Sequence, residues 1–135
     1  MTLFWVILAL IGAAIGNHLW AMLALIAFKR DVPCLTTERD LDHFRAAVAR
    51  QMYAALLQIA LLGGCPVLTI AGVGLRWIEP IHVVLLLPAW GVVLVMGLAG
   101  RRIEQTVRAI PVAEELRAER DAVVHTWRRR PIPDW

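Results

Sequence analysis

Five side chains with polar or reactive atoms lie inside long uncharged stretches of this sequence: Asn17, His18, Gln58, Cys65 and Thr69. An amide, imidazole or hydroxyl group without a hydrogen-bond partner costs several kcal/mol in hydrocarbon. These groups therefore need partners on neighbouring helices. We expect a polar patch in which Asn17 or His18 contacts Gln58, worth ~0.6 to 2 kcal/mol per contact.

Three roles are open to this polar patch. The first is hydrogen bonding that holds the helices together. The second is the lining of a hydrated path in an oligomer, formed by Asn17, Gln58 and Thr69. The third is haem ligation by His18, which is the least favoured. His82 belongs at the outer edge of its apolar run, so the two histidines cannot easily flank one iron.

The sequence offers no catalytic motif. It has no Walker loop, no GxSxG, no HExxH and no cysteine pair at zinc spacing. No carboxylate lies within the uncharged runs, which argues against an ion-coupled carrier. Cys34 and Cys65 belong at different depths, so a disulfide between them is not expected. We expect no cofactor, no metal and no nucleic-acid partner, and a non-catalytic protein rather than an enzyme.

The elements that must position these side chains are three uncharged runs at about residues 3–28, 53–75 and 81–98. A helix of about 20 apolar residues crosses ~30 Å of hydrocarbon. With 59% hydrophobic residues and a mean hydropathy of +0.64, the chain is too apolar for a soluble domain of this size. The sequence predicts an all-α integral membrane three-helix bundle in residues 1–100, followed by a helical tail in residues 101–135.

The basic residues predict an orientation. No lysine or arginine precedes the first run, five lie between the first two runs, one lies between the last two, and eight follow the third. The positive-inside rule then places the N-terminus outside and the C-terminus inside. Thirteen arginines against one lysine indicate a GC-rich bacterial coding bias, so we expect the bacterial cytoplasmic membrane.

Two amphipathic segments belong on the inner side. Thr37 and Asp40 have the spacing of a helix capping box, which predicts a helix over residues 38–52 that continues into the second run. Pro111 suits the first position of a tail helix. Two apolar seams predict docking surfaces, and they consist of Leu41, Phe44 and Val48 in the loop helix and Leu116, Val123 and Trp127 in the tail. The tail seam is expected to dock on the loop helix, the membrane surface or a partner. Residues 131–135 form either a frayed end or a docking peptide.

Small residues and prolines predict how the spans pack. Glycines let helix backbones approach closely in lipid, and the glycines assigned to helix packing are Gly12 and Gly16, which form a GxxxG pair, with Gly63, Gly64 and Gly91. Pro66 and Pro88 predict kinks in the second and third spans. The short link at residues 76–80 predicts that these two spans are antiparallel neighbours.

The order of segments resembles a known architecture. An outer N-terminus, one span, a basic inner loop, two spans in a hairpin and an inner helix resemble the proton-driven motor-channel family of TolQ and ExbB proteins, and residues 66–72 are similar to part of its second span. Residues 81–102 resemble the third helix of small copper-resistance-D-like four-helix membrane proteins, with 116–127 similar to the segment before their fourth span. The hairpin and loop here are shorter than in the first family, and the fourth span of the second is missing. Neither resemblance assigns a site residue.

These observations favour an accessory or assembly subunit without catalysis, which packs in the lipid bilayer against itself or within a larger membrane complex. The alternative is an oligomeric channel or transport component lined by Asn17, Gln58 and Thr69. A further alternative is a haem-binding redox subunit.

Overall fold

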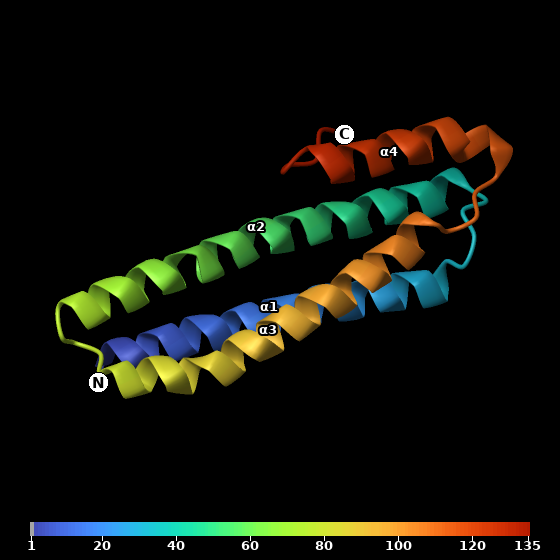
Figure 1. Cartoon of the computed structure of the whole chain (residues 1–135). Coiled ribbons are helices and arrows are strands. Elements are labelled where there is room, and N and C mark those ends of the chain that lie inside the picture. The colour runs from blue at the N-terminus through green and yellow to red at the C-terminus, as the bar shows by residue number, and fades with distance from the viewer. Residues whose placement is uncertain (1) are drawn as a thin grey trace.

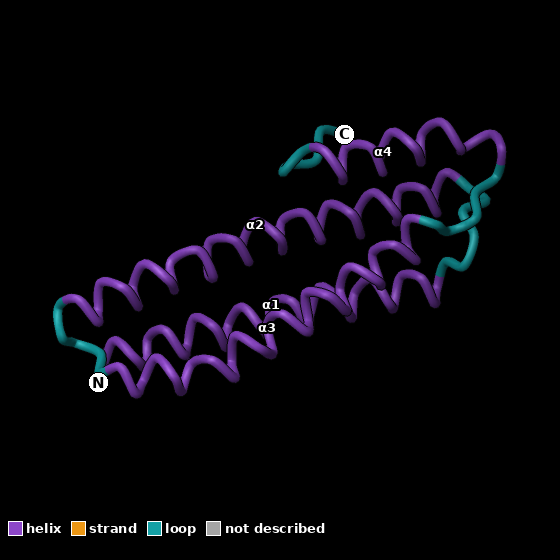
Figure 2. Tube along the Cα trace, viewed as in Figure 1, coloured by secondary structure: helices purple, strands orange, loops and turns teal. Residues whose placement is uncertain are grey.

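A computed structural model describes residues 2–135, and their regular structure is helical (Figures 1 and 2). The elements are α1 (Thr2–Asp31), α2 (Glu38–Gly74), α3 (Pro80–Arg108), the short 3₁₀ helix η1 (Glu114–Leu116) and α4 (Arg117–Arg129). Helices α1, α2 and α3 are long and apolar enough to cross a membrane. The all-helical class and the three long apolar helices predicted from the sequence are confirmed.

Helix α1 carries most of the packing between the long helices. It contacts both α2 and α3, whereas α2 and α3 have little direct backbone contact with each other. Helix α2 runs antiparallel to the other two (Figure 1). The antiparallel course expected for the second and third spans is therefore present, and the two helices meet mainly through side chains, because each packs its backbone closely against α1. The hairpin links their ends, and α1 supplies the surface on which each of them packs.

Specific hydrogen bonds start and end α2. The capping box predicted at its start is confirmed: the Asp40 backbone N–H donates to Thr37 Oγ1 at 3.2 Å, and Asp40 Oδ2 accepts from the Thr37 backbone N–H at 2.9 Å. At the other end, Arg76 takes a left-handed backbone conformation with φ of 57°. The N–H groups of Trp77 and Ile78 then both donate to the Gly72 carbonyl oxygen, which reverses the chain.

Prolines do not end either long helix. Helix α2 continues through Pro66 and α3 continues through Pro88. Kinks at these two positions stay a prediction.

The prediction that Pro111 occupies the first position of the tail helix is wrong. Helix α3 ends at Arg108, and the next helical turn begins only at Glu114. Between them the chain is extended, because the Leu35 N–H donates to the Pro111 carbonyl oxygen and the Ala113 N–H donates to the Leu35 carbonyl oxygen, both at 2.9 Å. The carbonyl of Pro111 thus pairs with the α1–α2 loop, and this bridge delays the helix.

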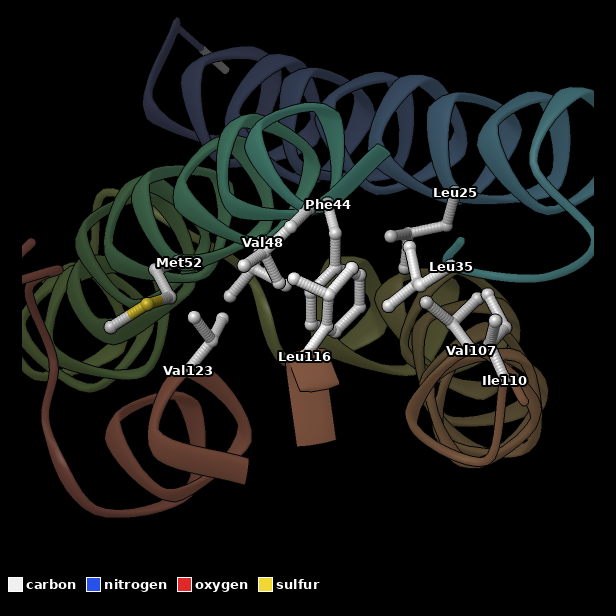
Figure 3. Packing of buried hydrophobic residues seen from close by; sticks show 10 residues of the cluster. Leu25, Leu35, Phe44, Val48, Met52, Val107, Ile110, Leu116 and Val123 are labelled. Atoms are coloured by element: carbon white, nitrogen blue, oxygen red, sulfur yellow. The ribbon is translucent and has the colours of Figure 1, made fainter. Parts of the chain in front are cut away.

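Two buried clusters hold the helices together. We call the larger one the four-helix cluster, which joins all four helices and their loops; Figure 3 shows its packing, and it consists of Leu25, Leu35, Leu41, Phe44, Val48, Met52, Val107, Ile110, Leu116 and Val123. The smaller one, the three-helix cluster, lies at the opposite end of the bundle and consists of Ile7, Ile11, Cys65, Ile78 and Leu86.

The four-helix cluster places the two apolar seams predicted for docking against each other. Leu41, Phe44 and Val48 are at most 1% exposed, and Leu116 and Val123 of the tail are buried beside them. Trp127 packs at the edge of the cluster. Of the three docking surfaces open to the tail, the structure therefore uses the beginning of α2. Five of the six seam residues are therefore covered within the chain, and Trp127 stays partly exposed at the edge.

Candidate functional site

Asn17 joins α1 to α2. Its side-chain Nδ2 donates to the Ala54 carbonyl oxygen at 2.8 Å and to Gln58 Oε1 at 3.2 Å. Both bonds cross between helices, so a single amide donor group satisfies one backbone carbonyl and one side-chain acceptor. Each interhelical bond of this kind contributes roughly 0.6 to 2 kcal/mol in a membrane.

His18 joins α1 to α3. Its Nε2 lies 2.9 Å from the Met96 carbonyl oxygen. Since a carbonyl oxygen can only accept, Nε2 carries the hydrogen in this bond. The ring fits because residue 100 is glycine: a Cβ there would lie 2.8 Å from Nε2. Neighbouring residues of α1 thus bond two different helices.

The other histidine of the three uncharged runs, His82, lies elsewhere. The ring of His82 packs against Phe4 with 5.0 Å between ring centroids. Phe4 and His18 are about 21 Å apart along α1 at 1.5 Å per residue. The structure therefore does not bring the two histidines to one site.

Cys65 and Thr69 bond their own helix instead of the Asn17–Gln58 pair. The Cys65 thiol donates to the Leu61 carbonyl oxygen at 3.3 Å, and the Thr69 hydroxyl donates to the Cys65 carbonyl oxygen at 2.8 Å. Cys65 is also fully buried in the three-helix cluster. Of the five polar side chains singled out in the sequence, only Asn17 and Gln58 form a hydrogen-bonded pair with each other among the described residues.

Two polar residues that sequence reasoning missed lie between α2 and α3. Gln51 is 6% exposed, and its Nε2 donates to Glu104 Oε1 at 3.0 Å. The other oxygen of Glu104 pairs with Arg108 at 3.3 Å, and the Arg108 guanidinium stacks over Trp127 at 4.4 Å from the ring centroid. The sequence did contain an indication that Gln51 is buried with the polar patch, because Gln51 lies two helical turns before Gln58 and so shares its face of α2.

These residues line two adjoining cavities of about 230 and 370 Å³, which share Gln51, Ala55, Ile59 and Glu104. We call the combined space the α2–α3 groove. Its further lining comes from all four helices and the C-terminal segment, and includes His18, Gln58, Arg101, Arg108, Trp127 and Arg130. The groove thus extends from the polar contacts of α1 to the end of the bundle that carries α4.

The five glycines assigned to helix packing do not pack within the chain. A Cβ added at any of them would meet no atom of the described residues within 4 Å, and they are Gly12, Gly16, Gly63, Gly64 and Gly91. The close approaches occur at Gly72 and Gly100 instead. For the GxxxG pair the reason is the rotation of α1, because Ile7, Ile11 and Ala14 face the neighbouring helices and turn Gly12 and Gly16 away from them.

Within residues 2–135 no group of three or more histidine, cysteine, aspartate or glutamate side chains could hold a metal ion. No protein family model, no curated protein and no solved structure matches the chain.

Proposed function

We propose that this protein is a small non-catalytic subunit of the bacterial cytoplasmic membrane, which assembles with itself or with larger membrane proteins. The N-terminus lies outside, and the amphipathic start of α2, the four-helix cluster and α4 lie inside. The observation that carries the proposal is the open glycine face of α1. Gly12 and Gly16 are exposed, and within residues 2–135 no atom lies within 4 Å of a Cβ position at either glycine, while the opposite face of the same helix is buried.

The surrounding surface supports this assignment. Large apolar side chains cover the outside of the long helices, with Ile70 at 74% and Ile59 at 68% exposure. Such a surface suits lipid, and a flat glycine patch within it admits the backbone of a second helix. The polar side chains Asn17 and His18 bond within the chain, which leaves packing as the means by which α1 contacts a partner.

Self-association tests the proposal directly. The protein with Gly12→Ile and Gly16→Ile should lose energy transfer between differently labelled copies in liposomes, because the added side chains keep the backbones apart. Gly97→Ile is the matched control, since this glycine of α3 also has no neighbour within 4 Å. A wild-type protein that stays monomeric, or assembly that survives the double substitution, would contradict the proposal.

Thiol labelling tests the orientation. Cys34 lies in the α1–α2 loop, and it should resist a membrane-impermeant maleimide added to intact spheroplasts. A Trp77→Cys protein that also carries Cys34→Ser should react, because residue 77 lies in the opposite loop. Labelling of Cys34 from outside would reverse the assignment.

The channel alternative has less support. The Thr69 hydroxyl donates to a carbonyl oxygen of its own helix, and the Asn17 amide donates to Gln58, so these polar groups already have partners within the chain. Haem ligation has less support still, because His18 Nε2 already bonds the Met96 carbonyl oxygen. Ion flux through liposomes would favour the channel, and a Soret band would favour haem.

A further inference from the structure

The α2–α3 groove lies where both helices change from uncharged to charged sequence. Helix α2 carries its last charged residue at Arg50 and is uncharged from Gln51 onward, and α3 carries its first arginine at Arg101. In a bilayer this boundary between uncharged and charged residues lies at the level of the lipid headgroups. The groove therefore opens where acyl chains meet headgroups.

Among residues 2–135, the charged side chains that line the groove leave one cation without an ionic partner. Glu104 pairs with Arg108, and Arg130 pairs with Asp134. Arg101 lines the groove but forms no hydrogen bond or ion pair with a side chain of residues 2–135. An arginine at this depth attracts a phosphate, with which guanidinium forms charge-assisted hydrogen bonds.

The groove also contains one buried acceptor without a donor. Gln51 is 94% buried, and its Nε2 is used by Glu104, but no group of the described chain donates to its Oε1. A buried acceptor without a partner is costly, by an amount similar to a lost hydrogen bond. A ligand that enters the groove and carries an N–H or O–H group would remove this cost.

Beside these polar groups the wall of the groove is apolar. Ala55, Leu56 and Ile59 follow Gln51 along α2 toward the middle of the bundle, and Ile59 is 68% exposed. Arg101 thus suits a phosphate, Gln51 Oε1 suits a hydrogen-bond donor, and the apolar wall suits an acyl chain.

We propose that the α2–α3 groove binds one phospholipid of the surrounding bilayer whose headgroup carries both a phosphate and a hydrogen-bond donor, as in phosphatidylethanolamine or phosphatidylglycerol. Arg101 binds the phosphate, Gln51 Oε1 accepts from the ammonium or hydroxyl group, and the acyl chain lies along Leu56 and Ile59. The site is separate from the glycine face of α1, so it does not depend on self-association.

Lipids with identical acyl chains and different headgroups test the site. Native mass spectrometry of the full-length protein should show phosphatidylethanolamine and phosphatidylglycerol bound about three- to tenfold more tightly than phosphatidylcholine, which has the phosphate but no donor. Gln51→Met keeps the side-chain length without the acceptor. It should bring the three affinities together.

Arg101→Gln and its control Arg102→Gln separate the phosphate contact from general surface charge. Arg101→Gln should weaken all three lipids by at least threefold relative to Arg102→Gln, whose side chain does not line the groove. Arg101 forms no bonds with other side chains of residues 2–135, so its loss should not affect folding. Equal affinity of the three lipids for the wild-type protein, or equal effects of the two arginine substitutions, would overturn the proposal. If equimolar glycerophosphoethanolamine, which lacks acyl chains, displaced the lipid, the claim that the ligand comes from the bilayer would be overturned.

Discussion

Gly100→Ala should destabilise the bundle, although alanine is the better helix former. A Cβ at residue 100 would lie 2.8 Å from His18 Nε2 and 2.9 Å from Cε1, whereas ordinary contacts begin at 3.4 Å. The imidazole ring must therefore retreat by about 0.6 Å. Because Nε2 bonds the Met96 carbonyl oxygen at 2.9 Å, the movement stretches or breaks the link between α1 and α3.

The expected cost follows from two opposing terms. Crowding a packed site costs about 1–3 kcal/mol, and replacing glycine by alanine in a helix returns about 1 kcal/mol at most. Gly97→Ala receives the same helix-forming gain without the crowding, since nothing lies within 4 Å of its Cβ position. The difference between the two variants therefore isolates the crowding, about 1–3 kcal/mol.

Reversible unfolding in mixed micelles, followed by circular dichroism over a range of sodium dodecyl sulfate fractions, measures this difference. The rescue variant is His18→Ala, which removes the ring and should make Gly100→Ala neutral or favourable. If Gly100→Ala and Gly97→Ala have the same stability, or if the crowding cost persists without the ring, the assigned contact between His18 and Gly100 is refuted.

Three further predictions concern other parts of the bundle. Asn17→Leu should lower stability by about 1–3 kcal/mol, with a coupling to Gln58→Leu of about 0.6–1.7 kcal/mol in a double-mutant cycle; strict additivity would count against the pair. Phe44→Ala, at a fully buried site, should cost about 3–5 kcal/mol and speed hydrogen exchange in α4, which unchanged exchange would disprove. Hydrogen bonds from Thr37 and from the backbone N–H of Thr36 hold the pKa of Asp40 below its usual value. The stabilisation from Asp40 is complete above its unfolded pKa and is lost as pH falls through the lower folded pKa. Amides at the start of α2 should therefore lose protection against hydrogen exchange, relative to the unfolded chain at the same pH, below about pH 4. Asp40→Asn should remove this dependence.

Local sequence patterns determined much of the fold. The length and composition of the three uncharged runs are enough to identify them as helices that can span a membrane, and no tertiary information is needed. The capping box at Thr37 and Asp40 is equally local, because its two hydrogen bonds join residues three positions apart. The spacing of Leu41, Phe44 and Val48 marks one helix face, which lies in the buried core.

Those local patterns could not show which surface each apolar or polar side chain packs against. A tail seam of Leu116 and Val123 has the same hydrophobicity whether it meets lipid, another protein or α2, and only the folded chain assigns it to α2. Pro111 shows the same limit, since its local preference for a helix start is overridden by a backbone pairing with Leu35, more than seventy residues away.

The sequence by itself determined which segments are helices, where the uncharged runs begin and end, and which polar groups need partners. These features depend on composition and on contacts within a few residues. The tertiary structure alone decided that Asn17 bonds α2 while His18 bonds α3, that Gly100 rather than Gly12 makes the close approach, and that Gln51 and Arg101 line one groove. The physical reason is the rotation of each helix about its own axis. That rotation is set by how all side chains of the bundle pack together, and no single segment contains it.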